Sequence, residues 1–245
     1  MARYDTAGQT QADVRARIDE GLRAHMNKVY GLMSVAMLVT AGVAWAVGTN
    51  DALLQIFMDP ATGKMTILGW GAMFLPLIMV FAFGAMLNRM SAAGAQLFFY
   101  VFAAAMGLSL AWIFRAFTGE SIAQTFLVTA IAFASLSLYG YTTKRDLSAM
   151  GTFLMMGLIG LIVAMVVNIF IASSAMSFAI SIIGILIFAG LTAWDTQKIK
   201  NTYIQHATAM DEEWLGKAAI MGALSLYLDF INLFMFLLQF MGNRE

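Results

Sequence analysis

Two aspartates interrupt apolar stretches of this sequence, and they are its strongest candidates for chemistry. Asp229 lies near the middle of the apolar run 218–240, roughly 16 Å from either end if that run is helical. Asp195 lies near the end of the preceding run, within the segment LTAWDTQKIK. A charge at the centre of a membrane helix costs at least about 2.5–3.5 kcal/mol. Both acids are therefore expected to face the protein interior or a water-filled cavity, not lipid.

Two carboxyl groups at hydrogen-bonding distance cannot both ionise at low cost, so such a pair shares a proton. The pair then loses its protons in two steps that belong to both groups. A protonated pair bonds to itself, whereas a deprotonated pair repels or recruits a cation, and carboxylate oxygens suit Ca²⁺. If Asp195 and Asp229 meet, they form a proton-dependent switch that binds Ca²⁺ transiently. The alternative is that the acids only tie helices together.

Further polar residues accompany these acids. Ser225, Asp229 and Asn232 are spaced i, i+4 and i+7, so they share one face of a helix. Asn168 adds a polar group inside the run 150–172. Arg89, in MLNRMS at the end of the second apolar run, is the candidate cation that would compete for a carboxylate and favour its charged form.

Composition defines the elements that must position these residues. The chain is 61% hydrophobic and 11% charged, whereas a soluble domain is about 25% charged. Each of seven apolar runs approaches the ~20 residues that span a bilayer, and in lipid such runs must be helical. Continuous runs also exclude a β-barrel, whose strands alternate. We predict an all-α membrane protein with seven transmembrane helices, near 29–48, 66–87, 93–114, 121–142, 150–172, 177–198 and 218–240.

We expect a cytoplasmic N-terminal segment over 1–27, with an amphipathic helix at 11–28, and a seven-helix membrane domain over 28–241. Only the connections 49–65 and 199–217 are long. The positive-inside rule predicts a cytoplasmic N-terminus and an external C-terminus, although a six-span chain with a re-entrant last segment is an alternative. One side would hold eleven cations against three, namely Arg3, Arg15, Arg17, Arg23, Lys28, Arg89, Lys144, Arg145, Lys198, Lys200 and Lys217 against Lys64, Arg115 and Arg244.

The sixth and seventh runs are consecutive and so antiparallel, which lets Asp195 and Asp229 approach each other. Counting along the runs leaves a difference of depth, since Asp195 would lie about one turn from the cytoplasmic side and Asp229 about three turns in. Helix tilt, or a deeper start of the seventh helix, would have to close this gap.

Several functions lack the residues that they need. The chain has no Cys and no net charge, which excludes thiolate chemistry and gives no sign of nucleic-acid binding. A retinal protein needs a Lys inside the last span, and Lys217 lies at its edge. Haem or serine-protease chemistry needs a His at membrane depth, whereas His25 and His206 are expected to be solvated. An intramembrane aspartyl protease would use two such acids, but the glycine-flanked setting is missing. We expect no enzyme, no cofactor and no ATP-driven transport.

Four stretches in order resemble one known family, over about residues 28–240. They are MGLSLAWIFRAFTGESIAQTF (106–126), SLYGYTTKRDLSAMG (137–151), GLTAWDTQKI (190–199) and SLYLDFINLF (225–234). Together they resemble the Bax inhibitor one family, also called the transmembrane Bax inhibitor motif family, and its bacterial branch in particular.

This resemblance implies six helices around a central seventh, in a bacterial inner membrane. It also implies a paired-aspartate pH sensor, carried over onto Asp195 in the DTQ motif and Asp229 in the LYLD motif, with Arg89 as the candidate latch. The implied activity is a pH-sensitive passive leak of Ca²⁺, so the expected partners are lipid, Ca²⁺ and protons. Bacterial relatives also suggest an alternative, an interaction protein that modulates a membrane protease or a stress response.

Overall fold

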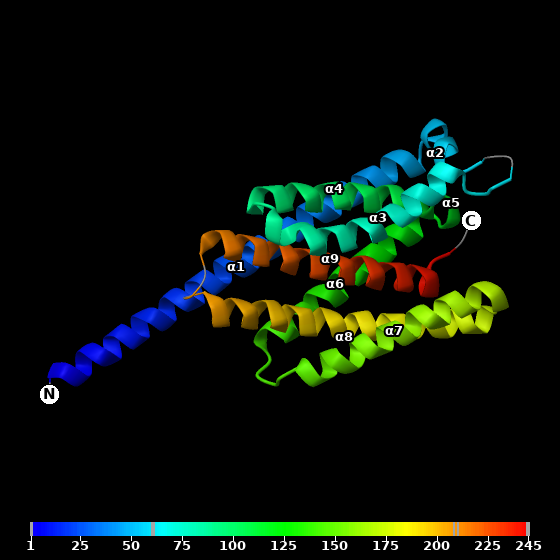
Figure 1. Cartoon of the computed structure of the whole chain (residues 1–245). Helices are drawn as coiled ribbons and strands as arrows, with labels where there is room; N and C mark the ends of the chain where they lie inside the picture. The colour runs from blue at the N-terminus through cyan, green and yellow to red at the C-terminus, as the bar shows by residue number, and fades with distance from the viewer. Residues whose placement is uncertain (1, 60–61, 208, 210, 244–245) are drawn as a thin grey trace.

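A computed structural model describes residues 2–59, 62–207, 209 and 211–243, with the backbone alone over 2–15. These residues form helices joined by short connections (Figure 1). Among the described residues the one β-type pairing is an isolated bridge between Met58 and Met65. The helices are α1 (Ala2–Gly48), α2 (Asp51–Phe57), α3 (Ile67–Met86), the 3-10 turn η1 (Leu87–Arg89), α4 (Ala92–Leu110), α5 (Ile113–Ala116), α6 (Gly119–Thr142), α7 (Ser148–Ile171), α8 (Ser174–His206) and α9 (Glu212–Met241).

Seven of the described helical segments are long and apolar enough to cross a membrane. They correspond one to one with the seven predicted runs, so the prediction of an all-α protein with seven transmembrane helices is confirmed. Seven crossings place the start of α1 and the end of α9 at opposite ends of the molecule, as Figure 1 shows.

The predicted long connection over 199–217 is wrong. Helix α8 continues to His206 and α9 begins at Glu212, so only residues 207–211 lie between them. Asp211 caps α9, because its side chain accepts a hydrogen bond of 2.8 Å from the backbone N–H of Trp214. The error arose because hydropathy marks where the apolar core ends, whereas a capped helix continues through polar residues beyond it.

The expected amphipathic helix at 11–28 is the first part of α1, which continues without a break across residues 27 and 28. Leu22 and Met26 on this part are 6% and 4% exposed, so they belong to the main core. The expected boundary between an N-terminal segment and the membrane domain therefore falls inside one helix.

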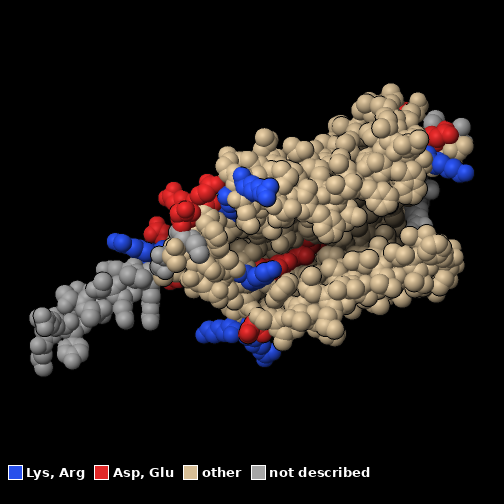
Figure 2. Space-filling model, in the orientation of Figure 1, with Lys and Arg blue, Asp and Glu red and all other residues tan. Residues whose placement is uncertain are grey.

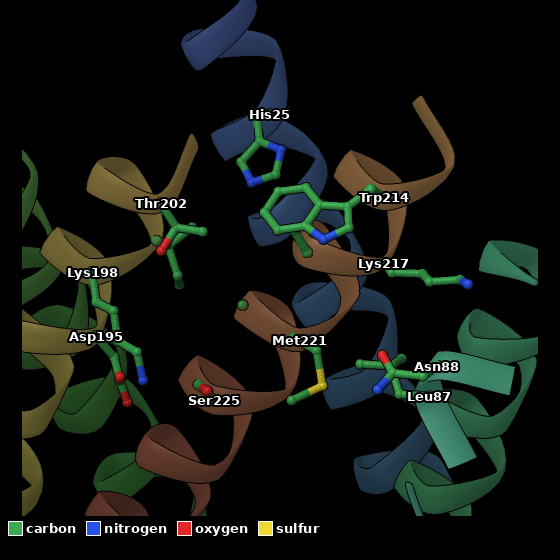
Figure 3. A pocket seen from close by; sticks show the side chains of 13 residues that line it. His25, Leu87, Asn88, Asp195, Lys198, Thr202, Trp214, Lys217, Met221 and Ser225 are labelled. Carbon is green, nitrogen blue, oxygen red and sulfur yellow. The ribbon is translucent and has the colours of Figure 1, made fainter. Parts of the chain in front are cut away.

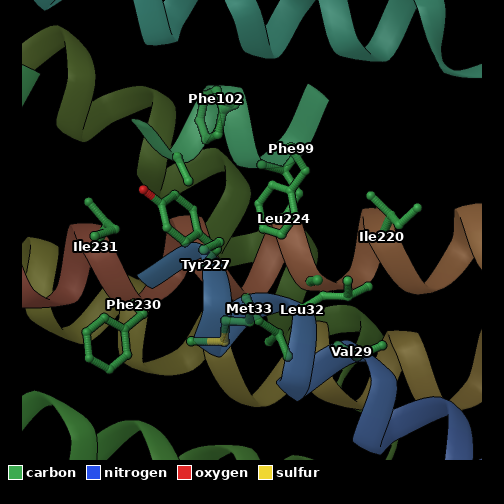
Figure 4. Close-up of a cluster of buried hydrophobic side chains, with 14 of the residues drawn as sticks. Val29, Leu32, Met33, Phe99, Phe102, Ile220, Leu224, Tyr227, Phe230 and Ile231 are labelled. Carbon is green, nitrogen blue, oxygen red and sulfur yellow. The ribbon is translucent and has the colours of Figure 1, made fainter. Parts of the chain in front are cut away.

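Helix α9 is the most buried of the seven membrane helices. In its apolar stretch of 18 residues 67% is buried, against 6% in that of α7. It packs on α1, α4, α6 and α8, while α3 packs mainly on α4 and α7 on α8. The expected ring of six helices around α9 is not confirmed. Figure 4 shows Tyr227 of α9 among apolar side chains that include Phe99 and Phe102 of α4.

Buried hydroxyl groups join these helices. Tyr227 shares a hydrogen bond of 2.6 Å with Thr40, which donates to the Ala103 carbonyl oxygen at 2.8 Å, so α9, α1 and α4 are linked. Such bonds satisfy polar groups that lipid cannot solvate. A second chain, between the hydroxyls of Tyr30, Ser137 and Thr196 at 2.5 and 2.9 Å, joins α1, α6 and α8.

The contact of α6 with α8 depends on Gly140. A Cβ atom built there would overlap the backbone carbonyl of Ala193, which has no room to move aside, whereas a Cβ on Gly160 would meet open space. We predict that Gly140→Ala lowers the free energy of unfolding by about 1–3 kcal/mol, as overpacking does. Thermal denaturation in detergent measures this, with Gly160→Ala as the matched control. Equal melting temperatures for the two variants would contradict the prediction.

Candidate functional site

The register of α8 against α9 places the two aspartates one helical turn apart. Ser181 contacts Gln239, Gly184 faces Phe236, and Ile199 faces Gly222, so the two helices run antiparallel in steady register. In this register Asp195 lies opposite Ser225, one turn before Asp229. The expected difference in depth is reduced because α8 continues beyond residue 198 and α9 begins before residue 218.

Asp195 and Asp229 form a carboxyl pair. Each lies within hydrogen-bonding reach of the other. Asp229 is 4% exposed, and its Oδ2 atom has no hydrogen-bond donor among the described residues. Two carboxylates offer only acceptors, so a shared proton or a cation must supply what this oxygen lacks. The arrangement can therefore hold a proton or bind a cation, and the two alternatives exclude each other.

The pair lies beside a cavity of about 310 Å³, here called the vestibule, where α8 ends and α9 begins. Figure 3 shows Asp195 and Lys198 on one wall and Ser225 and Met221 across from them on α9. Trp214 also lines this cavity, at the end of the view away from Ser225. The vestibule is thus a partly polar space whose inner end is Asp195.

A second cavity, of about 370 Å³ and here called the inner cavity, lies between α7, α8 and α9. Asp195, Ser225, Asp229 and Asn232 line it, amid apolar side chains such as Phe188. Asp195 and Ser225 line both cavities, so the carboxyl pair stands at the boundary between the vestibule and the inner cavity.

The predicted polar stripe of α9 faces this boundary. Ser225 and Asn232 lie on the same side of the helix as Asp229, and Asn232 donates a hydrogen bond of 2.8 Å to the Leu228 carbonyl oxygen. Asn168 does not join the group. Its side chain bonds the Ser177 hydroxyl at 2.7 Å and the Ser173 backbone N–H at 3.1 Å, so it holds the turn between α7 and α8.

The structure does not bring Arg89 to the pair. Its side chain is exposed in η1 and has no ion-pair partner within the described part of the chain, while its neighbour Asn88 lines the vestibule. Lys198 is the cation whose charge acts on both carboxyl groups. Its ammonium lies 4.9 Å from the centre of the Trp194 ring. Sequence reasoning missed Lys198, although its spacing of three residues from Asp195 puts the two on one helical face.

His25 is a second residue whose environment was predicted wrongly from the sequence. It is 8% exposed, lines the vestibule and contacts the Tyr203 ring in a tilted arrangement with ring centres 4.8 Å apart, so the expectation of a solvated side chain is wrong. Leu22 lies one turn earlier and is buried too. Because His25 follows the apolar stripe of α1, that spacing was the available sign of its burial.

The residues around the carboxyl pair offer few ligands for a cation. Among the described residues no three His, Cys, Asp or Glu side chains gather as a metal site would require. Asp195 and Asp229 supply carboxylate oxygens, and the Ser225 hydroxyl lines the same cavities. Ca²⁺ takes six to eight oxygen ligands, so this set fits a passing cation better than a tightly held one.

Comparison with known proteins gives concordant matches along almost the whole chain. A family model described as "Inhibitor of apoptosis-promoting Bax1" matches residues 22–245. An uncharacterized protein of Rickettsia prowazekii is 48% identical, over 93% of this chain and 92% of its own. The inner membrane protein YbhL of Escherichia coli K12 is 45% identical, over 92% of this chain and 94% of its own.

An uncharacterized membrane protein of Streptococcus pyogenes is 36% identical, over 96% of this chain and 97% of its own. The family match over residues 22–245 includes most of the first membrane span, the six other spans and both aspartates of the pair. The chain therefore belongs to the Bax inhibitor family of membrane proteins.

Proposed function

We propose that this protein is a pH-sensitive passive leak channel for calcium or a similar cation, gated by Asp195 and Asp229. The observation that carries this proposal is the place of the pair, at the boundary between two cavities, with a buried carboxylate oxygen that lacks a donor. A cation moving from the vestibule to the inner cavity has to pass these oxygens.

In the proposed cycle the protonated pair closes the boundary, because the two carboxyl groups then bond to each other. Loss of the proton leaves two acceptors that repel, which favours a shift of α9 and attracts a cation. Lys198 competes for the carboxylates in the role that Arg89 was expected to take. Flux runs down the existing gradient, since the pair supplies no energy.

We further propose that the vestibule faces the cytoplasm. Figure 2 shows most Lys and Arg side chains gathered at the end where α8 passes into α9, with flanks free of Lys and Arg between the two ends. The described cations at the opposite end are Lys64 and Arg115, the latter paired with Asp51. Positive residues concentrate on the cytoplasmic side, and the Escherichia coli relative is named an inner membrane protein.

The first test measures Ca²⁺ entry into liposomes that contain the purified protein. Flux is measured from about pH 6 to about pH 8 and should rise with pH, because deprotonation opens the boundary in the proposed cycle; one titrating step limits the rise to at most about tenfold per pH unit. The double variant Asp195→Asn, Asp229→Asn removes both ionisable groups and should leave flux nearly independent of pH, while Asp229→Asn alone should alter the pH dependence. Asp146→Asn, at an exposed acid between α6 and α7, should behave like the wild type.

Two results would count against this function. A pH-dependent flux that survives in the double variant Asp195→Asn, Asp229→Asn would show that the pair is not the sensor. Absence of flux above empty liposomes at every pH would remove the channel and leave contact with another membrane protein as the better explanation.

Lys198 gives a second prediction. Its positive charge stabilises the deprotonated pair, so Lys198→Met should move the midpoint of the flux–pH curve to higher pH without abolishing flux. The same liposome assay measures the shift. Lys144→Met, at an exposed lysine after α6, is the control, and equal midpoints for the two variants would refute the assigned role.

Orientation can be tested by labelling, because the chain has no Cys. Single cysteines placed by Lys64→Cys and Lys144→Cys lie near opposite ends of the bundle in connections between helices. We predict that a membrane-impermeant maleimide labels position 64 in intact cells and position 144 only after permeabilisation. The reverse pattern would place the vestibule outside.

A further inference from the structure

A groove between α1 and α6, here called the α1–α6 groove, lies apart from the carboxyl pair. Its volume is about 500 Å³, and none of the residues that line it lines the vestibule or the inner cavity. Arg23 and Asn27 of α1 and Tyr141 of α6 line it near the end of the bundle that is rich in Lys and Arg. The groove is therefore a separate site at the expected cytoplasmic surface.

The polar residues at this end are free to bind a ligand. Arg23 and Asn27 are one helical turn apart, and both are exposed. Asp19 and Glu20 precede Arg23 by one turn, yet within the described residues neither forms an ion pair with it. The Asn27 side chain likewise has no hydrogen-bond partner among the described residues. Two neighbouring groups thus offer N–H donors and a positive charge without an internal acceptor.

Lys200 adds a second cation beside the groove. Its ammonium donates a hydrogen bond of 2.7 Å to the Tyr141 carbonyl oxygen and lies 5.5 Å from the centre of the Tyr141 ring. Lys144 and Arg145 follow α6 directly and are exposed. The positive charge is therefore concentrated where α6 ends, around the polar mouth of the groove.

The remainder of the groove is apolar. Phe133, Ala134 and Leu138 of α6 line it, and Leu138 is 63% exposed, so this wall is open to the lipid phase. The polar atoms in its depth are already satisfied, because the hydroxyls of Tyr30 and Ser137 bond each other at 2.5 Å. A ligand that fits must combine an anionic head with an apolar chain.

We propose that the α1–α6 groove binds one anionic phospholipid. The phosphodiester accepts hydrogen bonds from Arg23 and Asn27, and an acyl chain lies along Phe133, Ala134 and Leu138. A guanidinium is well suited to phosphate oxygens, and basic pockets between membrane helices on the cytoplasmic side bind anionic headgroups. A zwitterionic lipid adds an ammonium that Arg23 and Lys200 repel, so the site selects for net negative charge.

Native mass spectrometry of the detergent-purified protein tests this proposal, with phosphatidylglycerol titrated against phosphatidylcholine of the same acyl chains. The wild type should bind the first lipid more tightly. Arg23→Gln removes the positive charge and its hydrogen bonds to the phosphate, so it should weaken phosphatidylglycerol binding about tenfold. Arg17→Gln is the matched control, since Arg17 is an exposed arginine on the same helix that does not line the groove.

A second variant tests the apolar wall. Ala134→Trp fills the groove and should weaken binding of phosphatidylglycerol, while free glycerol phosphate should not displace the lipid from the wild type. Melting temperatures close to that of the wild type establish that each variant is folded. The proposal fails if both lipids bind equally, if Arg23→Gln and Arg17→Gln behave alike, or if glycerol phosphate competes fully, which would identify a free-phosphate site.

Discussion

The burial of one carboxyl group on α9 is the constraint on which the rest of this structure depends. Asp229 is 4% exposed, in a helix surrounded by four others, where an unaccompanied charge would be prohibitively costly. Asp195 on α8 lies within hydrogen-bonding reach of this group, and the positive charge of Lys198 acts on both carboxyl groups. Helix α9 can occupy the interior because α8 carries these partners at the matching height.

That height is set by packing along the whole length of α8. Gly222 allows Ile199 to approach, Gly184 accepts the Phe236 ring, and Gly140 allows α6 to contact the backbone of α8 at Ala193. In lipid, close packing of small residues largely replaces the hydrophobic drive that joins helices in water. The carboxyl pair is thus held by contacts spread over several turns, and a shift of α9 would have to repack many of them.

Helix α6 connects the α1–α6 groove to α8, the helix that carries Asp195. The hydroxyl chain from Tyr30 through Ser137 reaches Thr196, the residue after Asp195 on α8, and Thr196 donates to the Thr192 carbonyl oxygen. Helix α6 contributes Ser137 to this chain and also lines the groove. Short hydrogen bonds therefore link α1 at the groove, through Ser137 of α6, to the turn of α8 that follows Asp195.

The sequence by itself determined the seven membrane helices, the two candidate acids and the polar face of α9, because hydropathy and helical periodicity are local properties that lipid enforces. Tertiary structure decided the rest. It placed Lys198 in place of Arg89 beside the pair, buried His25, and extended α8 to His206. These features depend on the register between helices far apart in the chain, and that register comes from the shapes of packed side chains, which no local pattern encodes.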